Sequence, residues 1–329
     1  MSPLLTQRST RRDCLRMGAA SCVAAALPLR AAEAPSFGAI DLDWVDKSRQ
    51  RPVPVRLYLP RAASPAQPAS ELPLVVFSHG IGGTRRSFSW LGEHFASHGV
   101  ASLHLQHVGS DRQIWSGNPL TVVGRLQQAA QEGEAIARAL DLRFALDTLL
   151  GGDFGLLVDR RRLVAAGHSY GANTTLLACG ARVESQGRLV DLQDSRLCAA
   201  IVLSSPPFYG QAAPRKVLGS VAVPSLHITS TEDIIRIPGY YSGWQDRVDV
   251  YDAIGSPRKW LVVYEGGAHN MLSDRILAAG DPLNLQKKAA TQTLVLAFLR
   301  QVFEGADGSL ARWQRQNAAV LHRYAESRT

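Results

Sequence analysis

The chain contains 329 residues, of which 46% are hydrophobic and 19% are charged, and its formal net charge is +8. This balance is typical of a folded globular protein with a large core. The basic residues are scattered and form no basic run with interleaved aromatic residues, so we expect that the protein does not bind nucleic acid. No uninterrupted apolar stretch of about 18 residues is present, and the sequence therefore predicts no transmembrane span.

The first 34 residues have the pattern of a targeting segment rather than of folded structure. They contain the arginine pair Arg11–Arg12, then an apolar stretch of modest hydrophobicity from Met17 to Leu27, and then small residues at Ala32 and Ala34. This order resembles a twin-arginine export signal that is cleaved near Ala34. A disordered basic tail is the alternative. We therefore expect an exported, periplasmic protein.

Two cysteines, Cys179 and Cys198, follow this segment. In an oxidising compartment they are able to form a disulfide, and two buried free thiols are the alternative, so the sequence leaves both states open. No spacing of cysteine and histidine residues matches a zinc site. We expect neither a metal nor a cofactor.

After the targeting segment, the pattern predicts a hairpin and then alternating strands and helices. Residues 39–60 alternate apolar and polar side chains on both sides of a short break, which is typical of a half-buried antiparallel hairpin. Continuous apolar runs that indicate strands buried on both faces occupy residues 72–80, 100–107, 162–167, 198–205, 224–230 and 259–267. Helical patterns occupy residues 87–99, 134–152, the segment after Ser169, and 287–303, where we expect a helix to close the chain.

This alternation favours an α/β fold. A mostly parallel, doubly wound sheet with helices on both faces is the simplest arrangement, with the N-terminal antiparallel hairpin at its edge. No internal repeat is evident. We therefore expect one domain over residues 35–329.

Three reactive side chains follow strands of this predicted sheet. Ser169 follows the strand at 162–167, and Asp233 and His269 come after the strands at 224–230 and 259–267. Ligands of such sheets bind beyond the carboxyl ends of the strands, so we expect these side chains to meet there. The order Ser, Asp, His is that of the catalytic residues in α/β-hydrolases.

The sequence G-H-S-Y-G around Ser169 predicts a nucleophile on a sharp, strained turn. The residues two before and two after such a serine must be nearly free of side chain, and Gly167 and Gly171 meet that condition. A serine hydroxyl is a weak nucleophile near neutral pH, and His269 is the candidate base, with Asp233 orienting its ring. A glycine-flanked loop serine is the alternative.

Glu232 is an alternative to Asp233 because the two acids are adjacent. We prefer Asp233, since the longer side chain of Glu232 would need a different approach to the histidine.

The segment S-H-G-I-G-G at the end of the apolar run at 72–80 predicts a loop, opened by His79 and Gly80, whose backbone N–H groups face the substrate. The N–H groups of Ile81 and Tyr170 are the candidate oxyanion hole, and a plain strand-to-helix turn is the alternative. His107 is a candidate substrate contact because it lies near the end of the predicted strand at 100–107. Trp115, in the irregular segment after that strand, and Trp244, after Asp233, are candidates for the wall of an acyl pocket. Ordinary packing is the alternative for all three.

Several motifs resemble those of the α/β-hydrolases of the predicted dienelactone hydrolase type, which are related to bacterial lipase-like and platelet-activating-factor-acetylhydrolase-like serine esterases. The motifs are RPVPVRLYLP, FSHGIGGTRRSF, LQHVGSD, ALDLRFALDTL, AAGHSYGANT, TSTED and GGAHNML. The resemblance implies that Ser169, Asp233 and His269 occupy the family's triad positions. True dienelactone hydrolases use a cysteine nucleophile, so a serine favours ordinary ester hydrolysis.

We therefore expect an exported serine hydrolase that cleaves carboxylic esters, with a small-molecule ester as its substrate, through an acyl-enzyme intermediate. An amidase or peptidase that uses the same three residues is one alternative. A non-catalytic binding protein on the same fold is the other.

Overall fold

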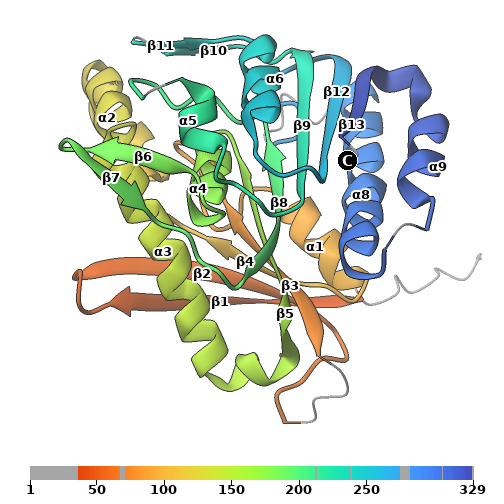
Figure 1. Cartoon of the computed structure of the whole chain (residues 1–329). Helices are drawn as coiled ribbons and strands as arrows, with labels where there is room; N and C mark the ends of the chain where they lie inside the picture. The colour runs from red at the N-terminus through yellow and green to blue at the C-terminus, as the bar shows by residue number, and fades with distance from the viewer. Residues whose placement is uncertain are drawn as a thin grey trace, which may run out of the picture. The chain divides into compact units, whose positions relative to one another are not determined.

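The computed structural model of the chain describes residues 36–66, 71–211, 213–237, 239–274, 282–305 and 307–327 (Figure 1). The targeting segment predicted at residues 1–34 lies outside the described residues.

A nine-stranded sheet forms the centre of the fold, in the order β1-β2-β4-β3-β5-β8-β9-β12-β13. Its middle strands, from β4 to β12, run parallel to one another, whereas β1, β2 and β13 pair antiparallel with their neighbours. The predicted α/β class and the N-terminal antiparallel hairpin are thereby confirmed. The strands are β1 (Phe37–Asp46), β2 (Arg51–Pro60), β3 (Leu72–Ser78), β4 (Ala101–Leu105), β5 (Val158–His168), β8 (Leu197–Leu203), β9 (Ser225–Glu232), β12 (Lys259–Ala268) and β13 (Leu321–Ser327).

Helices pack on both faces of the sheet. The helices are α1 (Ser89–Ser97), α2 (Val122–Ala129), α3 (Glu132–Gly151), α4 (Tyr170–Ala178), α5 (Pro214–Leu218), α6 (Trp244–Ala253), α8 (Pro282–Phe303) and α9 (Ser309–Gln316). Short 3-10 turns join them at η1 (Val108–Ser110), η2 (Arg112–Trp115), η3 (Pro119–Thr121), η4 (Asp153–Leu157) and η5 (Ala318–Val320).

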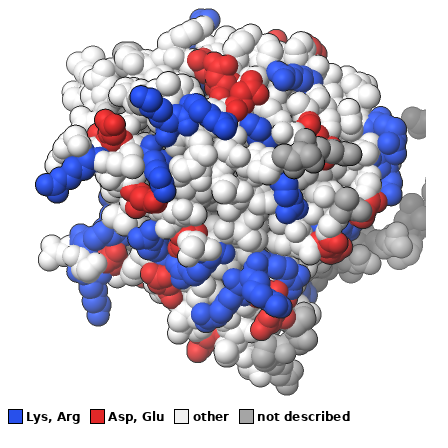
Figure 2. All heavy atoms as spheres, viewed as in Figure 1, with Lys and Arg blue, Asp and Glu red and all other residues white. Residues whose placement is uncertain are grey.

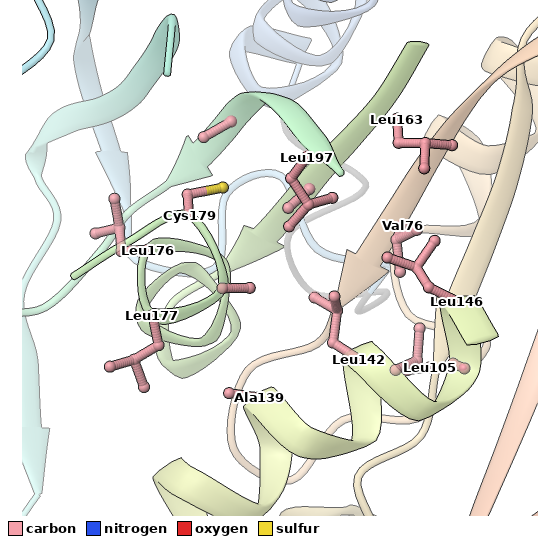
Figure 3. Packing of buried hydrophobic residues seen from close by; sticks show 14 of the residues in the cluster. Val76, Leu105, Ala139, Leu142, Leu146, Leu163, Leu176, Leu177, Cys179 and Leu197 are labelled. Atoms are coloured by element: carbon pink, nitrogen blue, oxygen red, sulfur yellow. The ribbon is translucent and has the colours of Figure 1, made fainter. Parts of the chain in front are cut away.

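The two faces have separate cores because side chains alternate along each strand. In β3, Leu74 and Val76 pack in the cluster that contains α3 and α4, and Val75 and Phe77 pack in the cluster that contains α1 and α8. Figure 3 shows the first cluster, to which Leu142 of α3 and Val76 of β3 belong. Double-sided burial explains why these strands are apolar at every position rather than at every second one.

The expectation that the helix at 287–303 closes the chain is wrong. This helix, α8, is followed by α9 and then by β13, which pairs antiparallel with β12 at the edge of the sheet. The indole of Trp313 fixes α9 to α8 by donating a hydrogen bond of 2.8 Å to the carbonyl of Ala290. In Figure 1, α8 and α9 lie side by side at the blue end of the chain.

Two small hairpins were also not predicted. They are β6 (Arg182–Ser185) with β7 (Arg188–Asp191), and β10 (Ile235–Ile237) with β11 (Tyr240–Ser242). Each has strands of three or four residues, too short to give a periodic signal.

The thiols of Cys179 and Cys198 are both free, and Cys179 is buried in the cluster of Figure 3.

On the face drawn in Figure 2, side chains of both charges lie interspersed. Within the described ranges, no helix has both the length and the apolar character needed to span a bilayer.

The packing of α3 against the sheet predicts a large cost for Leu142→Ala. Leu142 is fully buried, so the substitution should lower the free energy of unfolding by about 2–5 kcal/mol, as measured by urea denaturation. Leu156→Ala is the matched control, because the Leu156 side chain is 61% exposed, and its effect should stay within about 0.5 kcal/mol. Equal effects of the two substitutions would contradict this account of the core.

Candidate active site

A cavity of about 760 Å³ lies beyond the carboxyl ends of the parallel strands. Its lining includes residues within three positions of the ends of successive strands: Gly80 and Ile81 after β3, Ser169 after β5, Pro206 after β8, Ile234 after β9 and His269 after β12. This is the edge at which doubly wound sheets bind their ligands.

Ser169 lies on a strained turn between β5 and α4. Its backbone has φ 56° and ψ −123°, a conformation that non-glycine residues rarely adopt. The two flanking glycines allow this turn to approach its surroundings. A Cβ on Gly167 would lie 2.1 Å from the carbonyl oxygen of Gly171, and one on Gly171 would lie 1.9 Å from that of Ser78 at the end of β3.

Ser169, His269 and Asp233 form one hydrogen-bonded chain. The Ser169 Oγ lies 2.8 Å from Nε2 of His269, and Nδ1 of the same ring lies 2.6 Å from Oδ1 of Asp233. The carboxylate accepts a hydrogen bond only from a protonated Nδ1, so the neutral ring presents the lone pair of Nε2 to the hydroxyl of Ser169.

Strand pairing brings the acid and the histidine together. β9 and β12 continue in parallel register to the pair Glu232 and Ala268, and the next residues are Asp233 and His269. The register shifts between Tyr264 and Ala268, where Gly266 and Gly267 have φ of 61° and 97°. These conformations favour glycine and turn the loop back towards Ser169.

Asp233 is fully buried and held by three groups besides its own backbone. Thr229 donates a hydrogen bond of 2.7 Å to Oδ2, and Arg247 donates one of 3.2 Å to Oδ1, which also faces His269. Burial raises the pKa of Asp233, but the hydrogen bond and charge of His269 and the charge of Arg247 outweigh it, so the pKa lies well below its usual value. Asp233 is therefore ionised at neutral pH.

Glu232 lies on the other side of this loop. It is exposed, and its Oε2 accepts a hydrogen bond of 3.3 Å from the backbone N–H of Gly267. The carboxylate that contacts His269 is that of Asp233.

His168 contacts both the backbone and the ring of His269. Its Nε2 lies 3.0 Å from the carbonyl oxygen of His269, and the centroids of the two rings are 4.9 Å apart. Burial lowers the pKa of His168 to about 3, so the ring is neutral and its Nε2–H donates this hydrogen bond. In the sequence, the one indication of this role is the position of His168 next to Ser169.

The loop after β3 lies against Ser169. A Cβ on Gly80 would be 3.2 Å from the Cβ of Ser169. The N–H groups of Gly82 and Gly83 donate hydrogen bonds to Ser110 and Gly80. In the part of the chain that the structure describes, the N–H groups of Ile81 and Tyr170 have no such partner, and both residues line the cavity.

His79 holds this loop rather than facing the cavity. Its Nδ1 donates a hydrogen bond of 2.6 Å to the carbonyl oxygen of Gly80, and its Nε2 accepts one of 3.1 Å from the backbone N–H of His107. Both ring nitrogens are therefore engaged.

Of the three candidate substrate contacts, only Trp115 lines the cavity. Its indole packs on Gly82 and donates a hydrogen bond of 3.1 Å to the carbonyl oxygen of that residue. His107 does not reach the cavity, because its ring is fully buried between Ser78 and Asp141. Trp244 also lies outside the lining, since it packs edge-on against His322.

Other lining residues carry no recognisable sequence motif. Part of the wall is apolar and comes from the β10–β11 hairpin and the segment after β8, with Phe208, Ile235, Ile237 and Tyr240. Arg247 and Thr229 were likewise missed as partners of Asp233. Among the described residues, no three or more His, Cys, Asp or Glu side chains are grouped so as to hold a metal ion.

Comparison with known proteins points to one family. A family model described as platelet-activating factor acetylhydrolase, isoform II, matches residues 56–114. A platelet-activating factor acetylhydrolase of Cavia porcellus is 23% identical over 299 residues, which covers 76% of this chain. The chain resembles platelet-activating factor acetylhydrolases. The resemblance inferred from the motifs is thereby confirmed.

The extent of these matches is limited. The matched segment runs from β2 to η2 and includes the loop at Ile81, but it ends before Ser169. The chain aligns with 62% of the length of the Cavia porcellus relative.

Buried neutral histidines predict how stability changes with pH. Burial lowers the pKa of His104, His168 and His227 to about 3, and it lowers the pKa of His79 and His107 well below the usual range. In the unfolded chain these groups take up protons below a pH of about 6.5. Protonation of the unfolded chain therefore does not lower the free energy of unfolding above that pH. Below it, the free energy of unfolding falls as the pH falls towards about 3.

We expect the free energy of unfolding to fall between about pH 7 and pH 4, with a slope that corresponds to the uptake of several protons on unfolding, in urea denaturation at constant ionic strength. His227→Gln should reduce that slope near pH 5 by about 1.4 kcal/mol per pH unit, because one buried imidazole is removed. A stability that does not change over this range would contradict the prediction.

Proposed function

We propose that this protein is a serine hydrolase of carboxylic esters that works through an acyl-enzyme. The observation that carries the proposal is the hydrogen-bonded chain from Ser169 through His269 to Asp233, with distances of 2.8 Å and 2.6 Å, at the wall of a partly apolar cavity. The resemblance to acetylhydrolases supports ester cleavage in particular.

The first half of the reaction forms the acyl-enzyme. His269 Nε2 takes the proton of Ser169 as Oγ attacks the ester carbonyl carbon. The negative charge that develops on the carbonyl oxygen is stabilised by the N–H groups of Ile81 and Tyr170. His269 then passes its proton to the departing alcohol.

In the second half, water replaces the alcohol. His269 takes a proton from the water as its oxygen attacks the acyl carbon, and the proton returns to Ser169 Oγ as the acid leaves. Ionised Asp233 keeps the ring in the reactive tautomer and stabilises the imidazolium that forms in both halves.

The cavity supports a small-molecule substrate. A volume of about 760 Å³ is within the usual range for small-molecule sites. Trp115 covers the loop of the proposed oxyanion hole, so it is the lining residue that we propose as a substrate contact.

We further propose that the protein is exported and that residues 35–329 form a single domain. The arginine pair and the small residues before Ala34 support the export signal.

Ser169→Ala should abolish ester hydrolysis. With p-nitrophenyl esters from acetate to palmitate, the variant should lose at least about 10³ of kcat, because the nucleophile is removed. Wild type, and not the variant, should also be labelled by a fluorophosphonate. Turnover of p-nitroanilides without turnover of any ester would favour the amidase alternative, and a wild type that is neither active nor labelled would favour a binding protein.

Asp233→Asn and Glu232→Gln should differ sharply, although the two acids are adjacent. Asp233→Asn should lower kcat by about 10³–10⁴. The ring of His269 is then no longer held in the reactive tautomer, and the imidazolium loses the negative charge that stabilises it. Glu232→Gln should remain within about tenfold of wild type, since the side chain of Glu232 bonds the backbone N–H of Gly267 and not the ring of His269. The reverse order would assign the acid to Glu232.

A further inference from the structure

We infer that Arg138 is a positioning residue that fixes the spacing between the two N–H donors of the proposed oxyanion hole. The inference rests on the proposed function and adds a residue to its machinery. Arg138 belongs to α3, outside the cavity lining, and its side chain is fully buried.

The guanidinium of Arg138 contacts three separate segments of the chain. Nη2 donates a hydrogen bond to the carbonyl oxygen of His79 at the end of β3. Nε donates one of 2.9 Å to Oγ1 of Thr174 in α4, and Nη1 donates one of 2.7 Å to Oγ of Ser110 in η1. The planar group has fixed angles between these donors, so the three segments are held at fixed separations.

The first contact positions the N–H of Ile81. His79 lies two residues before Ile81, and its ring holds the intervening Gly80 through a hydrogen bond of 2.6 Å. The carbonyl of His79 is therefore an anchor point for the loop that carries this donor.

The second contact positions the N–H of Tyr170. Thr174 Oγ1 accepts the hydrogen bond from Arg138 and donates one of 3.1 Å to the carbonyl oxygen of Tyr170, one turn earlier in α4. The guanidinium carbon also lies 4.8 Å from the centroid of the Tyr170 ring. One side chain thus holds both residues that supply the proposed donors.

The third contact holds the loop after β3 through Ser110, which lies in η1 after β4. The carbonyl oxygen of Ser110 accepts a hydrogen bond of 2.8 Å from the N–H of Gly82, and the hydroxyl of Ser110 accepts one from Arg138. Gly82 directly follows Ile81. The loop is therefore held on both sides of the proposed donor.

The partners of Arg138 indicate that its role is to fix the positions of the segments that it contacts, and not to form an ion pair. They are a carbonyl, two hydroxyls and an aromatic face, and among the described residues no carboxylate lies within 4.0 Å of the guanidinium. Burial lowers the pKa of Arg138 to about 10, so it stays a cation at neutral pH. A buried cation without an ion pair is costly, and a neutral side chain of this length lacks the three-way fork.

The decisive experiment compares Arg138→Lys with Arg143→Lys. Arg143 lies on the same helix and also donates to backbone carbonyls, those of Leu192 and Gln193, but it touches neither donor segment. For the p-nitrophenyl ester that wild type cleaves best, Arg138→Lys should lower kcat at least about tenfold and leave KM within about threefold, because the donors act in the transition state. Binding of phenylboronic acid, whose adduct with Ser169 resembles that state, should weaken by a similar factor. Arg143→Lys should match wild type in all three.

Thr174→Val removes one of the three hydrogen bonds of Arg138. It keeps the inference testable if Arg138→Lys does not fold. It should lower kcat in the same direction by a smaller factor, with KM little changed. The unfolding midpoint should also fall, because Nε of Arg138 loses its acceptor.

The outcomes separate the inference from the proposed function. If Arg138→Lys lowers only the unfolding midpoint, or raises KM at constant kcat, Arg138 has a structural or binding role and the inference is wrong. If Arg138→Lys does not fold, an unchanged kcat in Thr174→Val overturns the inference. A wild type without hydrolysis or fluorophosphonate labelling overturns the proposed function, and the inference with it.

Discussion

The close approach of the Ser169 turn to the end of β3 is the contact on which the site depends. A side chain on Gly171 would collide with the carbonyl oxygen of Ser78, so only glycine allows the two backbones to touch. That contact places the start of α4 beside the loop at Ile81. It also holds Ser169 in a backbone conformation that would relax in a free loop. Strain at one residue is thus stabilised by packing between two neighbouring parallel strands.

The buried acid poses a separate physical problem, because an ionised carboxylate away from water needs compensation. Asp233 receives it from a hydroxyl, an imidazole and a guanidinium that lie on three different elements. Arg247 offsets the charge of Asp233 within the interior, while the carboxylate still faces His269 as an anion. The hydrogen-bond geometry therefore orients the ring, and the surrounding protein does not have to bury an excess negative charge.

The sequence predicted the parts that follow simple periodic or positional rules. Strands buried on both faces are continuous apolar runs, and the parallel order places their carboxyl ends at one edge, so Ser169, Asp233 and His269 were expected to meet and they do. What it could not predict depends on side-chain direction. His107 follows β4, at the edge of the sheet where ligand contacts are expected, but its ring turns towards Ser78 and Asp141. Arg138 looks like an ordinary helix surface residue in sequence, and only the packing of α3 against α4 buries it.

The edge strand β13 has a consequence for the order in which the chain assembles. β12 carries the loop of His269, and its outer backbone groups pair with β13, the last described element. While the polypeptide is being synthesised, β12 therefore remains an open edge until β13 has been made after α8 and α9, and an open edge invites pairing with other chains. The completed edge is β13 itself, where Arg323 and Glu326 place charges that oppose such pairing. The strand β13 thus protects the edge of the strand that leads to the histidine.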